Sequence, residues 1–600
     1  MQAARAIAQG VTEADEPVPP WAIALCASLA VATPTLIAFN VPPSATFFNQ
    51  AAALVGWGGF MIVLGACVPR SAWPRSPAAL ALLAAMTLIA ISALSASIFD
   101  AVPSTLSLSA VGTILPAVLV VAVAASVQRA GLGEFVFRAF SIGLVVAGVA
   151  STAIGLLQVF APGAADGDWI AIASIAGRAT GNLRQPNHLS SLLLWSVVAA
   201  VWLGEAKALN GRVAVALAIA FIYVVVLSAS RTGALGMATL AAWGLLDRRL
   251  SRRARVVLAL APLLYAAMYW ATSAWAAHSQ QVFGGQARFG KGIDLATNRY
   301  DVWSNTLSLI ASHPWFGVGF GDFNFAWTLT PFPNRPTEFF DHTHNVILNF
   351  AVEMGVPLAA VVIGLLVYAL WRALGHAIRD GREPAEGYPV QRAAFVIVFL
   401  VAVHSMLEYP LWYAYFLLPT AFAFGLCVER PVASEAAARA GEADPGNVTR
   451  PYVIAAMFLI LGGTLAVYDY MRVVVIFAPP AGAGSLEQRI ADGKKSVLFG
   501  HHADYAAATV AEHPGTEMKA FERAPHYLLD SRLMTAWAKA LDEQGESDKA
   551  RYVAARLKEF RNDQTEEFFA PCRPGVPASG VEPFQCQAPA RPLRFEDFRH

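Results

Sequence analysis

The sequence is poor in charged residues and nearly neutral overall. Only 14% of its 600 residues are charged and the formal net charge is +1, whereas a soluble domain carries roughly 25% charged residues. Because basic residues are not in excess, the chain lacks the electrostatic footprint of a nucleic-acid-binding protein, and no nucleic-acid partner is expected. The shortage of charge, together with 56% hydrophobic residues, predicts a membrane protein.

Cysteine is also scarce, with five residues in the chain. Cys26, Cys67 and Cys427 lie in or at the ends of apolar runs, where cysteine packs as a small hydrophobic residue. Cys572 and Cys586 lie close together in a proline-rich tail. We expect this pair to form a disulfide if the tail faces an oxidising compartment.

No cleavable leader is apparent either. Residues 1–20 are polar and rich in proline, and the first apolar run, 21–40, has no small-residue cleavage site. We therefore expect 1–20 to form a cytoplasmic N-terminal tail and 21–40 to form the first membrane span.

Long apolar runs dominate the chain up to about residue 475. A transmembrane helix needs about 20 mostly apolar residues, and about 13 runs of this kind predict an all-α polytopic membrane protein. The transmembrane domain is expected over 21–475 and a small helical domain over 476–600. The predicted spans are 21–40, 51–68, 78–99, 104–127, 135–160, 189–204, 213–230, 232–246, 256–277, 345–371, 391–409, 411–427 and 452–470.

Basic residues occupy every second loop between these spans, which by the positive-inside rule places those loops in the cytoplasm. They are Arg70, Arg75, Arg129, Lys207, Arg212, Arg248, Arg249, Arg252, Arg253, Arg255, Arg372, Arg379, Arg382 and Arg430. The long loops 161–188 and 278–344 and the tail are then expected outside. Within the tail, 533–560 has helical spacing around a break at Gly545, which resembles a tetratricopeptide helix pair.

Arg231 stands in a tight outer turn between two apolar runs. An arginine near the bilayer centre costs roughly 2.5–3.5 kcal/mol on insertion scales, and the positive-inside rule disfavours it on the outer side. One explanation is an arginine that extends to the lipid headgroups. The other is a site for an anionic ligand.

His344 ends the second outer loop at the start of an apolar helix. Asn345, Asn349 and Glu353 follow at i, i+4 and i+8, on one helix face. A polar stripe that enters a membrane helix faces the bundle interior or a water-filled cavity. This placement favours a functional histidine over an interfacial one that is merely hydrogen-bonded.

Two further roles are open for the residues around His344. Thr343 or Asp341 could cap the helix. Alternatively, His342, His344 and Asp341 could bind a metal ion, although histidines separated by one residue point to different sides of a helix. No metal and no cofactor are expected.

Other polar residues lie near the outer ends of spans. Arg178, Arg184 and Asn187 precede one span, and Asn187 with its neighbour could cap that helix or serve in the site. His404 and Glu408 are at i and i+4 near the end of another span and could pair. These residues are possible supporting members of the site.

The order of the outer motifs resembles the O-antigen ligase/O-antigen polymerase superfamily (Wzy_C). The motifs are "SRTG", "NRYDVW", "HPWFGVGFGDF" and "HTHNVILNFAVEMG", and the resemblance covers about 170–425. Three further segments resemble the PglL-type branch of protein O-oligosaccharyltransferases. They are "TPTLIAFNVPPSATFFNQAA", "RATGNLRQPNHLSS" and "HSMLEYPLWY".

The resemblance implies a metal-independent membrane glycosyltransferase of the GT-C type in the bacterial inner membrane, with its active site facing the periplasm. Its donor would be an undecaprenyl-pyrophosphate-linked oligosaccharide. Its acceptor would be a Ser or Thr hydroxyl of an exported protein such as a pilin. By motif matching, Arg231 and Arg299 would bind the pyrophosphate and His344 would be the essential histidine near the acceptor.

Three alternatives remain at this stage. The first is an O-antigen ligase that joins O-antigen to lipid A–core, and the second is an O-antigen polymerase. The third is a transporter, which predicts charged residues near the bilayer midplane and two related halves. The sequence instead gathers its polar residues at one surface and shows no internal repeat.

Overall fold

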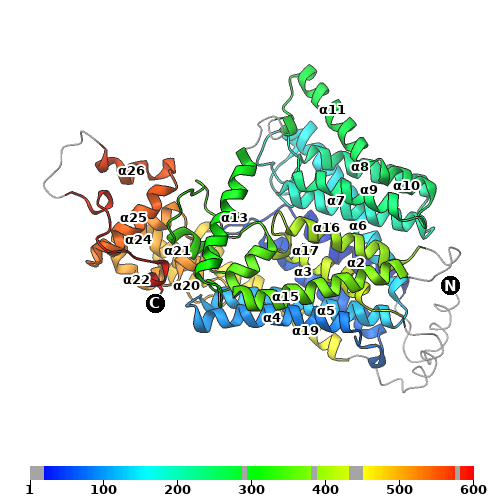
Figure 1. Cartoon of the computed structure of the whole chain (residues 1–600), viewed down its shortest axis with the longest axis horizontal. Coiled ribbons are helices and arrows are strands. Elements are labelled where there is room, and N and C mark those ends of the chain that lie inside the picture. Colours follow the sequence, from blue (N-terminus) through cyan, green and yellow to red (C-terminus); the bar gives the residue numbers. More distant parts are fainter. Residues whose placement is uncertain (1–18, 287–293, 380–387, 432–449, 574–581, 600) are drawn as a thin grey trace.

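The computed structural model describes residues 19–286, 294–379, 388–431, 450–573 and 582–599 (Figure 1). All regular elements within these ranges are α-helices or 3-10 helices. The prediction of an all-α protein is therefore confirmed. The predicted N-terminal tail falls outside the described residues, except for its last two positions.

Helices coincide with every predicted span. They are α2 (Pro20–Leu36), α3 (Phe47–Cys67), α4 (Pro77–Phe99), α5 (Ser104–Arg129), α6 (Gly133–Phe160), α7 (Pro186–Glu205), α8 (Gly211–Leu227), α9 (Arg231–Leu246), α10 (Arg252–Ala259), α11 (Ala261–Ser279), α15 (Val346–Arg379), α16 (Val390–Ser405), α17 (Ala414–Val428) and α19 (Arg450–Phe477). Seven described helices are long and apolar enough to cross a membrane, or eight if the bent pair α10–α11 is one span. The polytopic class is therefore confirmed. Because the other apolar helices are shorter, the number of spans stays a prediction.

Helix α7 lies at the centre of the bundle and is almost wholly buried. It packs against α6, α8, α9 and α16, so it has apolar side chains on all sides instead of one apolar stripe. Its Trp195 donates the indole N–H to the carbonyl of Ile397 in α16 at 3.1 Å. This packing holds α7 in place within the bundle, and Asn187 lies in its first turn.

The long outer loop is anchored on a break in α15. Gly355 has a φ of +76° inside this helix, and Pro357 follows two residues later, so the helix bends here. The break leaves carbonyls free, and Val352 accepts a hydrogen bond from the N–H of Val318 at 2.8 Å. A Cβ at Gly317 would lie 2.5 Å from the oxygen of Val352. The glycine-rich motif "HPWFGVGFGDF" thus needs glycine for this close approach.

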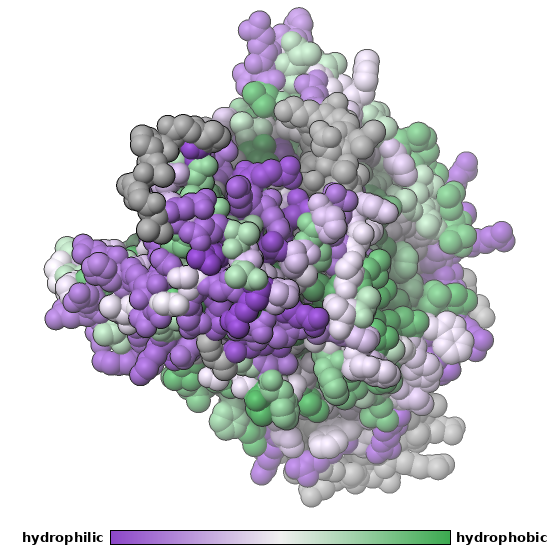
Figure 2. All heavy atoms as spheres, turned by 60° about the vertical axis from the view of Figure 1, so that its left-hand side comes forward, coloured by the Kyte–Doolittle hydropathy of each residue, from purple (hydrophilic) through white to green (hydrophobic). Residues whose placement is uncertain are grey.

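The outer loop and the tail share one hydrophobic core. From the loop come α13 (Asp294–Ser312) and α14 (Phe323–Leu329), with the buried side chains of Phe323 and Trp327. From the tail come Trp537 and Tyr552, whose hydroxyl donates to the carbonyl of Leu329 at 2.7 Å. Figure 2 shows polar side chains concentrated over this end of the molecule, with apolar surface on the flank to the right. Loop and tail therefore form one module, which we name the outer module after its predicted side of the membrane.

The tail is helical, as predicted. Its helices are α20 (Leu486–Gly493), α21 (Gly500–Val510), α22 (Met518–Phe521), α23 (Ala524–Tyr527), α24 (Ser531–Glu543), α25 (Ser547–Glu559) and α26 (Glu566–Phe569). Helices α24 and α25 form the expected antiparallel pair, and Gly545 makes the turn between them with a φ of +78°. Only glycine adopts this conformation without strain.

The basic helix α10 and the tail lie at opposite ends of the bundle (Figure 1), as the alternation of basic loops requires. One of the basic residues of these loops, Arg382, lies outside the described residues.

A periplasm-active reporter fused after His600 is expected to be active, and one fused near Arg249 to be inactive. The physical reason is the retention of arginine-rich loops in the cytoplasm. Enzyme assays of whole cells at matched expression measure this, and the reverse pattern would reject the orientation.

Candidate functional site

Glu408 is the centre of a polar cluster at the end of the bundle that the sequence predicts to face outward. It lies between the end of α16 and the 3-10 helix η4 (Pro410–Trp412). One carboxylate oxygen lies 2.7 Å from Arg299 Nη2 and accepts a hydrogen bond from Asn187 Nδ2 at 3.1 Å. The other lies 3.0 Å from His344 Nδ1. Four residues singled out in the sequence therefore meet, from α7, α13, the end of the outer loop and the segment after α16.

Arg231 joins this cluster through its neighbour Ser230. The Ser230 hydroxyl donates to Asn187 Oδ1 at 2.7 Å and caps α9 by accepting the N–H of Gly233 at 2.9 Å. Arg231 is the first residue of α9 and is half-buried. No hydrogen bond or ion pair to its side chain occurs within the described part of the chain. Sequence analysis missed Ser230, although a serine directly before a helix is a common N-cap.

The electrostatics keep Glu408 ionised. Burial raises the pKa of its carboxyl group, but the hydrogen bond from His344 and the charge of Arg299 outweigh burial and lower it to about 2. A carboxylate can only accept, so His344 Nδ1 carries the hydrogen between them. His344 Nε2 is then the nitrogen that can accept a proton.

The backbone of His344 is strained. Its φ is +54°, a conformation that is uncommon for residues other than glycine. Strain of this kind costs of order 1–3 kcal/mol and tends to occur at functional sites. The carbonyl of the preceding residue, Thr343, accepts the indole N–H of Trp303 at 3.0 Å. The surrounding packing therefore helps to hold this conformation.

His342 supports His344 from the buried side. It is 5% exposed, and its ring lies against Tyr409 with centroids 3.3 Å apart. Its Nδ1 contacts the Asp341 carboxylate, and its Nε2 lies 3.3 Å from His344 Nδ1. Burial lowers the pKa of His342 more than the carboxylate raises it. Sequence analysis missed this contact between His342 and Tyr409.

Three groups in the site could bind a metal ion. His342, His344 and Glu408 each offer a ligand atom within 4.8 Å of the others. The third member is Glu408, whereas the sequence alternative had named Asp341. Arg299 already neutralises Glu408 and would lie beside a bound cation, which disfavours metal binding by charge repulsion.

The polar stripe below His344 faces the bundle interior, as predicted. Asn349 and Glu353 are buried, and Asn349 accepts the N–H of Thr343 at 3.1 Å. The predicted cap was wrong. Asn345, not Thr343 or Asp341, caps α15, because its side-chain oxygen accepts two backbone N–H groups of the first turn at 3.1 and 3.2 Å.

Arg178 and Arg184 hold the backbone around the site. The Nε of buried Arg178 donates to the carbonyl of Ser228 at 3.0 Å, in the turn that leads to Arg231. Arg184 donates to the carbonyl of Ala38 at 2.7 Å. Both guanidinium groups therefore make structural contacts and shape the outer turns.

Two expectations about helix ends differ from the structure. Gln185, not Asn187 or its neighbour, caps α7 with its side-chain oxygen. His404 does not pair with the Glu408 side chain; its Nδ1 lies 2.8 Å from the hydroxyl of Ser191 in α7. The i, i+4 rule holds only inside a helix, and α16 ends at Ser405.

Sequence analysis overlooked an Asp-x-Asp pair, Asp166 and Asp168, in the loop 161–188. Asp166 accepts the backbone N–H groups of Asp168, Trp169 and Ile170 at 2.8–3.1 Å. These bonds close a tight turn, as aspartate commonly does. Turn formation accounts for this residue without a catalytic role.

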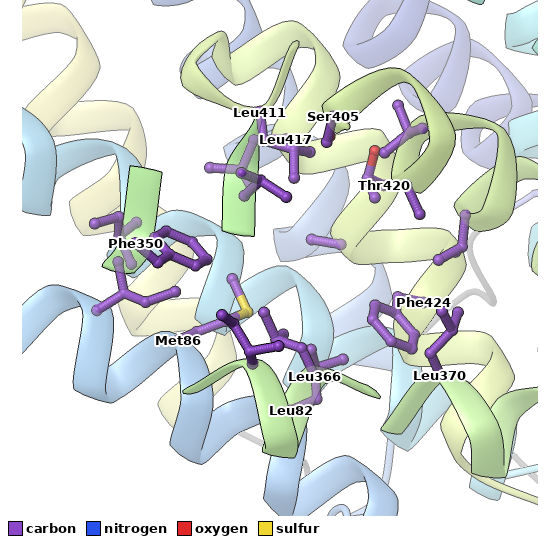
Figure 3. Close-up of a pocket in the computed structure, with 18 of the residues that line it drawn as sticks. Leu82, Met86, Phe350, Leu366, Leu370, Ser405, Leu411, Leu417, Thr420 and Phe424 are labelled. Atoms are coloured by element: carbon purple, nitrogen blue, oxygen red, sulfur yellow. The ribbon is translucent and has the colours of Figure 1, made fainter. Parts of the chain in front are cut away.

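An apolar cavity of about 500 Å³ lies beside the polar cluster (Figure 3). It is bounded by α4, α5, α15, α16 and α17. Its lining includes Leu82, Met86, Phe350, Leu366, Leu370, Leu417 and Phe424. The lining reaches Met406 and Leu411, which flank Glu408 along the chain. A ligand with a long hydrocarbon part and a charged head could therefore contact both regions.

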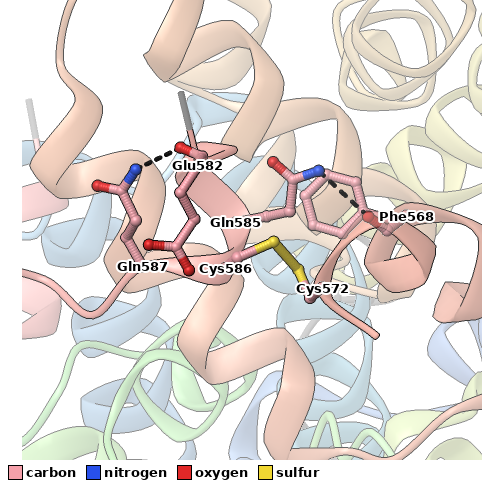
Figure 4. The surroundings of a disulfide bond; sticks show 6 residues. All are labelled: Phe568, Cys572, Glu582, Gln585, Cys586 and Gln587. Atoms are coloured by element: carbon pink, nitrogen blue, oxygen red, sulfur yellow. Dashed lines mark hydrogen bonds between the residues drawn. A yellow bond between two sulfur atoms is a disulfide. The ribbon is translucent and has the colours of Figure 1, made fainter. Parts of the chain in front are cut away.

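Cys572 and Cys586 are joined in a disulfide in the outer module (Figure 4). We expect mass spectrometry of unreduced protein to find the two peptides linked, because closing a loop of this size adds about 3 kcal/mol to stability. Cys67, which is exposed, serves as the control and should be alkylated in the same sample. Two free thiols in protein from an oxidising compartment would contradict the pairing.

Residues 215–363 match the O-antigen ligase family, residues 392–569 match the C-terminal region of virulence factor membrane-bound polymerase, and residues 179–203 match protein glycosylation ligase. The chain is 27% identical over 259 residues to a general O-oligosaccharyltransferase of Acinetobacter baylyi (strain ATCC 33305 / BD413 / ADP1), which covers 42% of this chain and 43% of that protein. It is 24% identical over 263 residues to a ComP-specific O-oligosaccharyltransferase of the same strain, which covers 42% and 44%. The matches thus span less than half of these relatives. They confirm the resemblance that the motifs indicated.

Proposed function

From the similarity to two O-oligosaccharyltransferases, together with the O-antigen ligase match of residues 215–363, we propose that this protein is a membrane O-oligosaccharyltransferase. It transfers an oligosaccharide en bloc from undecaprenyl pyrophosphate to a Ser or Thr hydroxyl of an exported protein, such as a pilin. The reaction takes place on the periplasmic side of the inner membrane. The observation that carries the proposal is the cluster in which Glu408 links His344 to Arg299 and, through Asn187, to the turn of Arg231.

The donor would lie across the boundary between cavity and cluster. Its isoprenoid chain fits the apolar cavity, and its pyrophosphate then lies at the outer end of the bundle. Arginine binds phosphate oxygens through two parallel N–H donors. Arg231 has its side chain available for this contact, whereas Arg299 would share its guanidinium between the phosphate and Glu408. Both stabilise the negative charge that grows on the leaving pyrophosphate.

The acceptor would lie on the His344 side of the cluster. His344 Nε2 takes the hydroxyl proton while the oxygen attacks the anomeric carbon of the donor sugar. A new C–O bond forms, and the bond to the pyrophosphate breaks with its electron pair on the phosphate oxygen. Glu408 stabilises the imidazolium that results and holds the ring in orientation, as the carboxylate does in a catalytic triad.

The arginine mechanism predicts that metal removal leaves activity unchanged. Transfer by purified protein should survive EDTA, because Arg231 and Arg299 supply the positive charge that a cation would otherwise supply. In vitro glycan transfer with and without the chelator measures this. Loss of activity that Mg²⁺ or Mn²⁺ restores would instead assign His342, His344 and Glu408 as ligands.

Profiling of glycoproteins and lipopolysaccharide in a deletion strain tests the proposed function. Loss of a glycosylated exported protein supports it. The second candidate is ligation of O-antigen to lipid A–core, which the match of residues 215–363 favours and which predicts loss of capped lipopolysaccharide only. Shortened O-antigen chains would indicate a polymerase.

A further inference from the structure

A second cavity lies at the other end of the bundle from the site. It has a volume of about 420 Å³ and lies between α7, α8 and α10, which are neighbours in Figure 1. Its lining divides into two parts. The basic rim consists of Lys207, Arg252 and Arg253, and the apolar floor consists of Val201, Ala214, Val215, Ala218 and Val257.

The basic rim has an excess of positive charge. Glu205 is the acidic residue in the lining, and its carboxylate accepts the backbone N–H of Ser251 at 3.1 Å. Within the described ranges, no ion pair reaches the side chains of Lys207, Arg252 or Arg253. Three cations next to one carboxylate repel one another unless an anion lies among them.

The position of α10 is fixed, so the cavity is preformed. Arg255, on the same helix, donates to the carbonyl of Gly244 in α9 at 3.3 Å. A Cβ at Gly244 would lie 2.7 Å from the backbone nitrogen of Ala259, which shows how closely α9 and α10 pack. Helix α10 is amphipathic, with Ala254 and Leu258 buried, and bends by 53° from α11. A basic amphipathic helix of this kind is typical of the membrane interface.

We propose that this cavity binds one anionic phospholipid. The phosphate lies within the basic rim, and an acyl chain covers the apolar floor. An anionic phospholipid matches both parts of the cavity, whereas two other occupants each match only one. A free anion would leave the apolar floor in water, and a zwitterionic lipid would not neutralise the rim. Because the cavity is remote from the His344 cluster, this inference is independent of the proposed transferase activity.

Native mass spectrometry of the full-length, delipidated protein tests the proposal. Phosphatidylglycerol should form a retained one-to-one adduct, and phosphatidylcholine at the same concentration should not. The double substitution Arg252→Gln/Arg253→Gln should weaken phosphatidylglycerol binding about 30-fold, since each basic residue at a membrane surface contributes about 1 kcal/mol. Both side chains are exposed, so the variant is expected to fold.

Two controls make the outcome decisive. Arg248→Gln removes an exposed arginine outside the cavity and should leave binding unchanged. Val215→Trp fills the floor while the rim keeps its charge, and should also weaken the adduct. The proposal is overturned if both lipids bind equally, if the double variant and Arg248→Gln behave alike, or if inorganic phosphate displaces the lipid at equal concentration. Lys207→Gln provides a second test of the rim on a different element.

Discussion

His344→Ala is expected to lower glycan transfer about 10²–10⁴-fold, the usual contribution of a general base, and to leave donor binding largely intact. The reason lies in the charge types of the site. Guanidinium cannot act as a base, whereas the Nε2 of an imidazole can. Transfer assayed in vitro at matched membrane levels, together with binding of the lipid-linked donor, separates the two effects.

The arginines should show the opposite pattern. Arg231→Lys keeps the charge and loses the two parallel donors, so donor binding and transfer should both fall. Arg299→Lys should in addition release Glu408 and so disturb His344. Glu408→Gln keeps the shape of the side chain but loses its charge, and should slow transfer with donor binding retained.

His278→Ala is the matched control for the histidine variant, because this exposed histidine ends α11 away from the Glu408 cluster. It should transfer glycan normally. Near-normal transfer by His344→Ala at equal expression would defeat the assignment. If His344→Ala abolished donor binding and the arginine variants did not, the two roles would be reversed.

The membrane core could be predicted from the sequence because its signal is local. An apolar run of sufficient length must become a helix in lipid, since no other partner exists for its backbone groups. The stripe of Asn345, Asn349 and Glu353 follows in the same way from helical periodicity within one segment. Both predictions need no knowledge of which helices are neighbours.

The Glu408 cluster could not be predicted, because it depends on packing between distant segments. Asn187, Arg299, His344 and Glu408 come from four separate parts of the chain, and the relative positions of α7, α13, α15 and α16 bring them together. The mistaken pair of His404 and Glu408 has the same origin. When a helix ends a few residues early, side chains at i and i+4 no longer lie on one helix face. Helix ends are the least certain part of a sequence-based assignment.

The second large effect is expected at Asp322, outside the Glu408 cluster. This side chain is fully buried and lies in the outer loop directly before α14. Its carboxylate oxygens lie 2.7 Å from His526 Nδ1 and 2.7 Å from Arg599 Nη2, both in the tail. Arg599 also lies 3.8 Å from Asp100, at the end of α4. One carboxylate thus joins loop, tail and membrane bundle.

The same region positions the catalytic segment. Asn324, two residues after Asp322, donates to the carbonyl of Phe340 at 2.9 Å and accepts the N–H of Leu529 at 2.8 Å. Phe340 begins the stretch that leads to His344. A tail that separates from the loop would therefore remove one support of His344, although no tail residue belongs to the Glu408 cluster.

Asp322→Ala is expected to destabilise the outer module by about 3–5 kcal/mol, because it removes the carboxylate from its buried pair with His526 and leaves Arg599 with the longer, 3.8 Å ion pair to Asp100. Transfer should fall strongly, and the tail should become sensitive to protease while the membrane bundle stays intact. Limited proteolysis and thermal unfolding of purified protein measure this. Asp492→Ala is the control, since that residue is exposed and pairs with exposed Lys495; it should change stability by no more than about 0.5 kcal/mol. If Asp322→Ala left the tail protected but still abolished transfer, Asp322 would act directly on the reaction and the supporting role of the tail would be wrong.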